Sequence, residues 1–510
     1  MISKRTMYAI NFLFLCILIV AVSVPQAIAA EMQLWGKPLT IHGYLNQSVG
    51  VGISGEYFDT QKRFQSAIFQ GLIEGTYEPK RNVMVFMSGK LNADWAYPAL
   101  SNNTLWQEKG FDKSRDRLYM LDDFKDVLHE AHVTWRPQTF YFRVGKQIVR
   151  WGETDGFRLM DQINPVDQRR GLADVEFETT ILPAWLARAE YAVANPPEWC
   201  QGMSFQAIFN PNLEFRPNES IKPGNDFSGI WAPYLETSLG GRYPLDFARI
   251  GSPVLQLEEP SGSDGFEYAL RARAVVHDAA MTLNYYYGRD KDPVAVLAGP
   301  AKREISQYDG RLTIHPNYRG FYPRFRFIGG TFTKDIDALQ STFLGGVAPL
   351  FRFEAFYAFN KTFASDFRNI FTEHDEVRWA AGADWKVKID ALNPIAFFTI
   401  SPQFYHRKIV GYPDNDTLSG PNGEPLRENN YQASLMISTS YMGGKLQPSV
   451  FWLRNISEQA DFVRPQLTYS WSHHWRYTLG AIFFDGEKEK KSYQQFKHKD
   501  QVYFTVSYRF

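Results

Sequence analysis

The chain ends in the ten residues QVYFTVSYRF, 501–510, and this stretch decides the fold. Every second side chain in it is apolar or aromatic, and the side chains between them are mostly polar. Because successive side chains of a β-strand point to opposite faces, the alternation predicts a strand with one apolar face. The apolar face holds Val502, Phe504, Val506, Tyr508 and Phe510, and the other face holds Gln501, Tyr503, Thr505, Ser507 and Arg509.

The same alternation recurs along most of the chain, for example in 351–360 and 377–388. It predicts 18 strands, with 16 as the fallback because 183–194 and 203–214 show the weakest pattern. The predicted spans are 39–53, 66–78, 83–95, 126–136, 139–150, 183–194, 203–214, 265–276, 281–289, 322–334, 349–360, 375–388, 394–407, 430–441, 445–454, 462–472, 475–485 and 499–510.

Three features favour a membrane barrel over a soluble sandwich. Predicted strands of about ten to fourteen residues match a tilted crossing of the bilayer and exceed the usual five or six. Short connections alternate with long ones, which is the layout of outer-membrane barrels. The long ones are 96–125, 152–182, 216–264, 289–321 and 408–429. The aromatic end of the last strand, Tyr508 and Phe510, is similar to the assembly signal that the barrel-insertion machinery reads. We therefore predict an all-β fold, a transmembrane antiparallel β-barrel of the outer-membrane type with long external loops.

The composition excludes several other classes of protein. The 510 residues contain 55 Lys and Arg against 55 Asp and Glu, so bulk positive charge for nucleic acid is absent. With 22% charged residues and a mean hydropathy of −0.34, the chain does not fit a helical membrane protein. Its two cysteines, Cys16 and Cys200, exclude a disulfide framework or a four-cysteine metal site.

The N-terminus predicts where the chain goes. Lys4 and Arg5 precede an apolar run over 10–24, and Ala27-Ile28-Ala29 supplies a small-residue cleavage pattern. This is typical of a secretory signal peptide, 1–29, leaving 30–510 as one barrel domain. The alternative is an uncleaved membrane anchor. The predicted location is the outer membrane of a Gram-negative bacterium, with outer-membrane lipid as the surroundings.

Two motifs carry a resemblance to a known family. Residues 145–153 read GKQIVRWGE, residues 163–167 read INPVD, and 323–330 read PRFRFIGG. They resemble the bacterial outer-membrane family catalogued as domain of unknown function 1302. The resemblance implies a porin-like barrel of a kind sometimes discussed alongside exporters of hydrophobic compounds. It supplies no established catalytic or binding residues.

The connection 152–182, directly after the first motif, is a candidate constriction. It is too charged for lipid and too long for a simple turn. Either it folds into the barrel and narrows the pore, or it packs across the rim and only stabilises that end. Its charged candidates are Glu153, Asp155, Arg158, Asp161, Asp167, Arg169 and Arg170.

Strand parity predicts a lumen with excess positive charge, since nine arginines face five carboxylates there. Arginine binds carboxylates and phosphates through paired hydrogen bonds, so we expect a preference for anions. The alternative is that these charges only pair with one another and with water. The pore-lining candidates are Arg143, Arg188, Arg271, Arg273, Arg324, Arg326, Arg352, Arg378, Arg464, Glu130, Glu190, Glu267, Glu354 and Asp384.

Catalysis is not predicted. The sequence has no G-x-S-x-G or H-E-x-x-H motif, and of its histidines only His473 and His474 are adjacent, in a predicted turn. We expect no cofactor, no metal and no nucleic acid. The predicted function is a channel for small solutes of unknown identity. The alternative is the outer-membrane partner of an envelope transport system that exports hydrophobic compounds.

Overall fold

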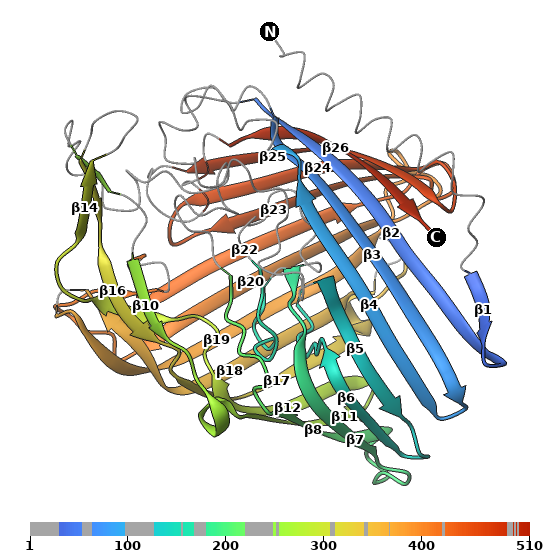
Figure 1. The fold of residues 1–510 in the computed structure, drawn as a ribbon. Helices are drawn as coiled ribbons and strands as arrows, with labels where there is room; N and C mark the ends of the chain where they lie inside the picture. Colours follow the sequence, from blue (N-terminus) through green and yellow to red (C-terminus); the bar gives the residue numbers. More distant parts are fainter. Residues whose placement is uncertain are drawn as a thin grey trace.

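Eighteen antiparallel strands close into a barrel in the computed structural model of the chain (Figure 1). The structure describes residues 30–53, 64–96, 127–154, 157–167, 180–219, 248–250, 254–305, 312–340, 345–366, 368–420, 424–486, 493, 496 and 499–510. The predicted signal peptide lies outside these residues. The barrel strands are β2 (Lys37–Gly52), β3 (Phe64–Lys80), β4 (Val83–Asp94), β5 (Leu128–Trp135), β6 (Phe140–Gln147), β7 (Ala184–Ala192), β8 (Gly202–Asn210), β11 (Glu267–Val276), β12 (Ala279–Arg289), β17 (Arg324–Asp335), β18 (Leu350–Ser365), β19 (Ile370–Val387), β20 (Phe398–Val410), β22 (Asn429–Ser438), β23 (Leu446–Asn455), β24 (Ala460–Ser470), β25 (Trp475–Gly486) and β26 (Gln501–Arg509).

The ring closes where the last strand meets the first. β26 pairs antiparallel with β2, from Tyr44 opposite Arg509 to Gly52 opposite Gln501. The hydrogen-bonded sheet has 20 strands, and two of them, β1 (Ala30–Leu34) and β21 (Leu418–Ser419), are short additions beside β2 and β18. The other 18 are the strands that the alternation predicts, including the two weakest, which are β7 and β8. The predicted fold class and the strand number of 18 are therefore confirmed.

Tight turns join many strands at one end of the barrel. Between β11 and β12 only His277 and Asp278 turn the chain, and both have positive φ, 47° and 62°. Two consecutive positive φ values are typical of a type I′ hairpin turn, whose twist matches that of the strands. The side chain of Gln201 bonds to Asp278 at this turn and links it to the neighbouring connection.

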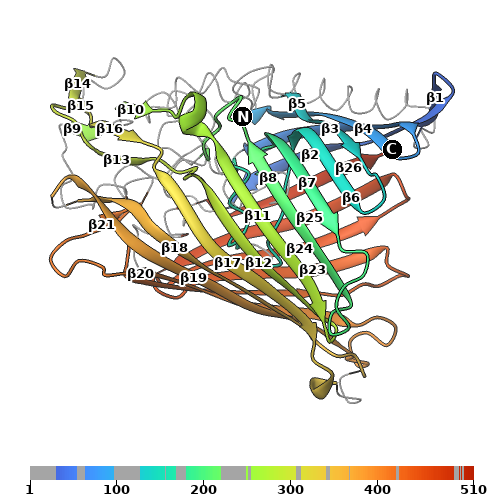
Figure 2. The ribbon, with the colours of Figure 1, turned by 90° about the horizontal axis from the view of Figure 1, so that it is seen from below.

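Longer connections lie at the opposite end, and two small sheets form there. One contains β10 (Val254–Glu258), β13 (Val294–Leu297) and β16 (Asn317–Phe321); the other contains β9 (Ala248–Ile250), β14 (Lys302–Ile305) and β15 (Leu312–His315). Figure 2 shows both sheets together at one side, beyond the ends of the tilted barrel strands. Within the described residues, two short 3₁₀ segments, η5 (Gly262–Gly265) and η6 (Asp337–Leu339), lie between barrel strands.

The two faces of the strands differ as the alternation requires. Leu270, Leu283 and Phe504 are 54%, 59% and 47% exposed, and they form part of the outer, lipid-facing wall. Gln501 and Glu354, on the inner phase of their strands, have no exposed surface at all. Within the described residues, no helix is long and apolar enough to cross a membrane.

The C-terminal residue sits directly on the seam of the ring. The backbone N–H and carbonyl of Phe510 both bond to Gly43 of β2, at 3.0 Å each. A side chain at position 43 would collide with the Phe510 ring, so glycine is required there. The terminal aromatic residue is thus part of the strand pairing that closes the barrel.

Candidate functional site

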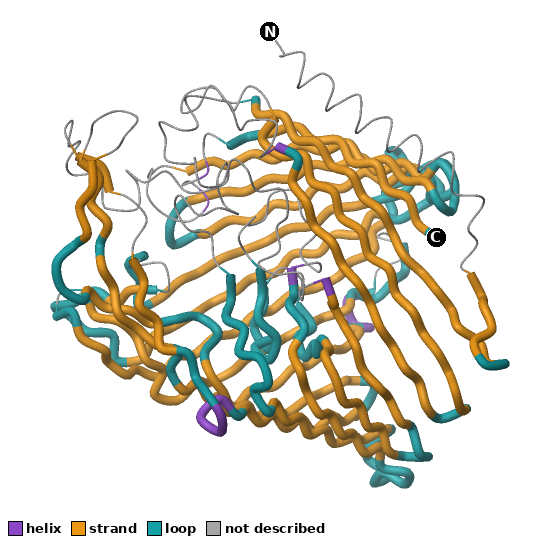
Figure 3. Tube along the Cα trace, viewed as in Figure 1, coloured by secondary structure: helices purple, strands orange, loops and turns teal. Residues whose placement is uncertain are grey.

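The segment after β6 folds inward and reaches the far side of the lumen (Figure 3). The backbone N–H groups of Glu153 and Thr154 both donate to Oε1 of Glu354 on β18, the second at 2.6 Å. Arg352 of the same strand donates to the carbonyl of Glu153 at 2.6 Å. The Phe157 ring stacks on Tyr405 of β20, with the centroids 5.2 Å apart. Because five strands separate β6 from β18 in the ring, these contacts run across the interior. We call residues 148–167 the inner loop.

Two polar side chains hold the inner loop in shape. Oδ1 of Asp161 accepts the backbone N–H groups of Trp151 and Gly152, at 2.5 and 3.0 Å. Asn164, which is 2% exposed, accepts from the N–H of Val149 at 2.7 Å and donates to the carbonyls of residues 147 and 182. The spacing between the two sequence motifs therefore corresponds to a hydrogen-bonded hairpin.

The first sequence motif begins at a glycine in β6, two residues before that strand ends. Gly145 has a φ of +136°, and a side chain there would collide with the backbone of Ala131 and His132 on β5. The first motif thus begins within β6, at a position where only glycine fits against β5, and the chain leaves the wall after Gln147.

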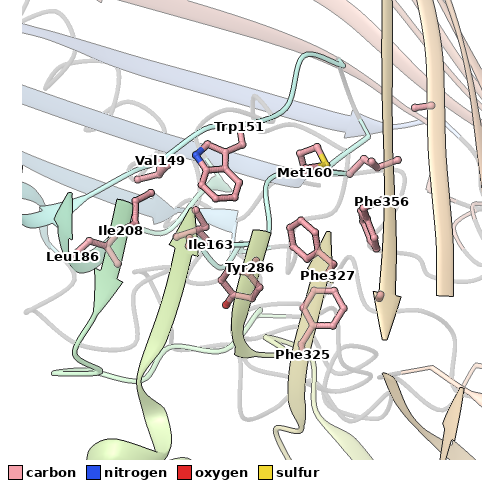
Figure 4. Close-up of a cluster of buried hydrophobic side chains, with 14 residues drawn as sticks. Val149, Trp151, Met160, Ile163, Leu186, Ile208, Tyr286, Phe325, Phe327 and Phe356 are labelled. Carbon is pink, nitrogen blue, oxygen red and sulfur yellow. The ribbon is translucent and has the colours of Figure 1, made fainter. Parts of the chain in front are cut away.

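The apolar side of the inner loop packs on the inside of the barrel wall (Figure 4). Trp151 is 1% exposed and its indole N–H donates to Gln206 on β8 at 2.8 Å. The members of this cluster are almost fully buried, although they lie inside a barrel. From the inner loop they are Val149, Trp151, Leu159, Met160 and Ile163, and from the wall Leu186, Ile208, Ala269, Tyr286, Phe325, Phe327, Phe356, Ala358 and Ala380. Part of the lumen is therefore filled by a dry core.

Most of the predicted pore-lining charges face inward, and several are paired. Arg188 bonds to Glu190 at 2.9 Å, Arg352 to Asp384 at 2.9 Å, and Arg271 lies 3.8 Å from Glu153. Arg378 pairs with Glu376 at 2.6 Å, and Glu267 pairs with Lys291 at 2.5 Å. Glu130 accepts the backbone N–H of Ile148 at 2.9 Å, at the root of the inner loop. Arg464 faces inward over the Phe451 ring, 6.0 Å from its centroid.

Four inward arginines lie close together on the strands β6, β7 and β11. Arg143 and Arg188 are directly opposite each other and both lie over the Tyr141 ring, 5.3 and 5.0 Å from its centroid. Arg271 and Arg273 follow on β11, with β8 between them and β7. Within the described residues, neither Arg143 nor Arg273 makes an ion pair. We call Arg143, Arg188, Arg271 and Arg273 the arginine strip.

Two predicted pore-lining arginines are on the wrong side of the wall for that role. Arg324 and Arg326 share a face of β17 with Ile328, which is 43% exposed on the outer surface. Phe325 and Phe327, between and after them, point inward and pack against the inner loop. The predicted inward orientation of Arg324 and Arg326 is therefore wrong, because the lumen behind this strand is apolar.

The charged residues predicted to form a constriction in the inner loop differ in the bonds that they make. Glu153 and Asp161 bond within the loop and to the wall, as described above. Arg158 donates to the carbonyls of Asp161 and Asn164, at 2.5 and 2.8 Å, and burial lowers the pKa of its guanidinium. The backbone N–H of Asp167 donates to Thr180 at 2.8 Å. Asp155, Arg169 and Arg170 lie outside the described residues.

Parity reasoning also missed some inward charges. Glu376 is two residues before Arg378 on β19, and the same alternation would have found it. Lys361 lies 3.5 Å from both Asp290 and Glu376. A register shift between Ala358 and Lys361 breaks the alternation there, so parity had no signal for it. Among the described residues there is no group of three or more His, Cys, Asp or Glu that could hold a metal ion.

A closed antiparallel barrel with an apolar outer wall and a loop folded into its lumen defines a transmembrane β-barrel of the outer-membrane, porin-like class. The chain belongs to the family described as protein of unknown function DUF1302, whose model matches residues 17–510. No curated protein matches the sequence.

Several solved structures are similar in fold. One is OccAB3 of Acinetobacter baumannii, with a TM-score of 0.46 and 9% identity over 92% of this chain and 99% of that one. Another is OpdK of Pseudomonas aeruginosa with vanillate, at 0.43 and 9% over 92% and 98%. A third is OmpF of Salmonella typhi in complex with daunomycin, at 0.35 and 9% over 94% and 100%.

Proposed function

We propose that this protein is an outer-membrane channel for small solutes, that it prefers anions, and that the inner loop narrows its pore. The observation that carries the proposal is the arginine strip, which lines the wall beside the inner loop. It brings four guanidinium groups together with two carboxylates, Glu190 and Glu153, within ion-pair distance. Fixed charges in a narrow, low-dielectric pore act strongly on permeating ions.

The width of the arginine strip determines the salt concentrations at which its effect on ions should be measured. It spans β6, β7, β8 and β11, so its width is about three strand spacings, or roughly 15 Å. The Debye length is about 10 Å at 0.1 M salt and about 30 Å at 0.01 M. The four charges therefore act together in dilute electrolyte and separately in concentrated electrolyte.

The experiment measures reversal potentials in planar bilayers across a KCl gradient, in dilute and in concentrated salt. We expect the natural protein to prefer chloride, most strongly at low salt. Replacing all four arginines of the strip with glutamine should remove most of that preference. The matched control is R324Q/R326Q, which removes two arginines from the outer surface and should leave the reversal potential unchanged. An unchanged reversal potential in the quadruple variant would refute the anion-channel proposal.

The alternative function, as the outer-membrane partner of a system that exports hydrophobic compounds, makes a different prediction. Such a barrel would conduct few ions without its partner. Reconstituted protein with no single-channel conductance, although folded, would favour this alternative. A signal peptide that directs the chain to the outer membrane, and an insertion machinery that reads Tyr508 and Phe510, are common to both proposals.

A further inference from the structure

The outer wall of the barrel carries a hollow that lies on the lipid side. It has a volume of about 480 Å³ and is formed over β6, β7, β8, β11, β12 and β17. Ala189 and Ala207 are directly opposite each other and provide a low floor. Larger outward side chains rise around them, among them Phe142, Phe205, Leu270 and Tyr285. A second apolar hollow, of about 530 Å³, lies over β4 to β7 on the same wall, so the hollow alone does not select an occupant and its neighbouring charges have to be considered.

The side chains that line the hollow indicate what kind of chemical group could fill it. The outward side chains are aliphatic or aromatic, and Leu270 and Phe205 are 54% and 48% exposed. A hydrocarbon chain gains by filling an apolar hollow of this kind, because it contacts side chains on several sides. An acyl chain of a membrane lipid fits both the composition and the position in the wall.

Arg324 and Arg326 lie on the same outer face as the hollow, between it and the end of the barrel that carries the long connections. Ile328 lines the hollow, and Arg326 is two residues before it on β17, so about 7 Å separates their Cα atoms. Arg326 is exposed, lies over the Phe359 ring at 5.8 Å, and makes no ion pair within the described residues. Arg324 lies over the Tyr287 ring at 5.1 Å and is also held by Asp264 at 3.3 Å.

The guanidinium groups of Arg324 and Arg326 lie at the level of the lipid headgroups. In barrels of this class the long connections are external, so Arg324 and Arg326 lie at the outer leaflet boundary. Aromatic side chains mark that boundary, and arginine binds phosphate oxygens through paired, charge-assisted hydrogen bonds. Arg326 makes no ion pair within the described residues, although the Asp375 carboxylate is close enough to attract it, so its guanidinium can still bind a phosphate at the level of the lipid headgroups.

We propose that the hollow and the two arginines form one binding site for a phosphate-bearing lipid of the outer leaflet. One acyl chain lies in the hollow over Ala189 and Ala207, and the phosphate lies against Arg326, with Arg324 beside it. The site is on the outer wall and does not depend on conduction, so its success or failure is separate from that of the channel proposal.

The test compares two lipids that have the same chains. Purified barrel in detergent is incubated with dioleoyl phosphatidic acid or with dioleoylglycerol, which has the same chains and no phosphate, and native mass spectrometry counts the bound lipids. We expect the phosphatidic acid to bind at least about tenfold more tightly, as one charge-assisted contact to phosphate would give. R324Q/R326Q should abolish this preference. A189F/A207F should weaken binding of both lipids by filling the hollow.

Matched variants elsewhere on the outer wall make the result specific. Arg454 of β23 also faces outward, where it pairs with Asp461 at 2.9 Å, and R454Q should leave the preference intact. A481F adds an aromatic ring to the outward face of β25 and should change nothing. Heat-modifiable migration on gels checks that every variant is folded.

Three outcomes would overturn the proposal. One is equal binding of the two lipids by the natural protein. Another is a loss of preference in R454Q as large as in R324Q/R326Q, which would indicate only diffuse attraction of charge. The third is self-association of lipid-free barrels that A189F/A207F abolishes while added phosphatidic acid has no effect, since the hollow would then receive a second copy of the chain.

Discussion

Glu354 is the attachment point of the inner loop, and replacing it with alanine tests whether that loop controls the pore. The side chain is fully buried, and Oε1 accepts two backbone N–H groups of the loop, from Glu153 and Thr154. Leaving such groups unsatisfied costs about 1–3 kcal/mol each, so the attachment loses about 2–6 kcal/mol. A loss of 2 kcal/mol already changes the ratio of attached to detached loop by about 30-fold.

The assay for E354A is single-channel recording in a planar bilayer, followed by limited trypsin digestion. We expect a larger or noisier open level than in the natural protein, and cleavage at Arg158, which is protected when the loop is attached. The matched control is E458A, which removes a buried carboxylate between β23 and β24 that pairs with Arg427 and has no bond to the inner loop within the described residues. A folded E354A barrel with unchanged current and unchanged resistance to trypsin would refute the idea that this attachment sets the pore.

Four further outcomes follow from the same geometry. W151A should destabilise the inner loop by about 3–5 kcal/mol, because it removes a buried aromatic side chain, and the same trypsin assay would reveal it. Deleting Phe510 removes both backbone bonds to Gly43, so we expect less heat-modifiable barrel in the outer membrane. L479R, on the outer face of β25, should cost up to about 2–4 kcal/mol in unfolding titrations, whereas T478R on the inner face should cost less. Burial raises the pKa of Asp500, just before β26, to about 6. A carboxyl whose pKa is raised by folding lowers stability once it ionises, so stability should fall between about pH 4 and pH 6 and D500N should lack that fall.

The fold could be predicted from the sequence because barrel strands obey a simple rule. The alternation in 501–510 reports on a wall with lipid on one side, and the structure has a strand wherever that pattern occurs. β7 and β8 had the weakest pattern, and inward residues explain why. Leu186 and Ile208 are apolar but face the inside, where the inner loop covers them. Their presence on the inner phase blurs the contrast between the two faces.

Strand alternation could predict less about the inner loop than about the barrel. The motifs at 145–153 and 163–167 marked the right segment, but sequence alone left open whether it folds inward or packs across the rim. The contacts that decide this join residues about 200 positions apart, such as Thr154 and Glu354. Such contacts depend on the curvature of the closed ring, which no local pattern records.

The two misplaced arginines show where the parity rule needs more care. Alternation says that Arg324 and Arg326 share a face, but it does not say which face is inside. The first half of β17 suggests that the arginines line the lumen, since charge is expected to avoid lipid. The second half shows the opposite, because Thr331, Thr333 and Asp335 are in phase with Phe325 and Phe327. In a strand without a bulge, alternate side chains keep to the same face along its whole length. The polar side chains in the second half of β17 therefore show which face of the first half points into the lumen. The arginines then face outward at the membrane boundary, where an anionic headgroup can reach them, and the two phenylalanines face a part of the lumen that the inner loop keeps dry.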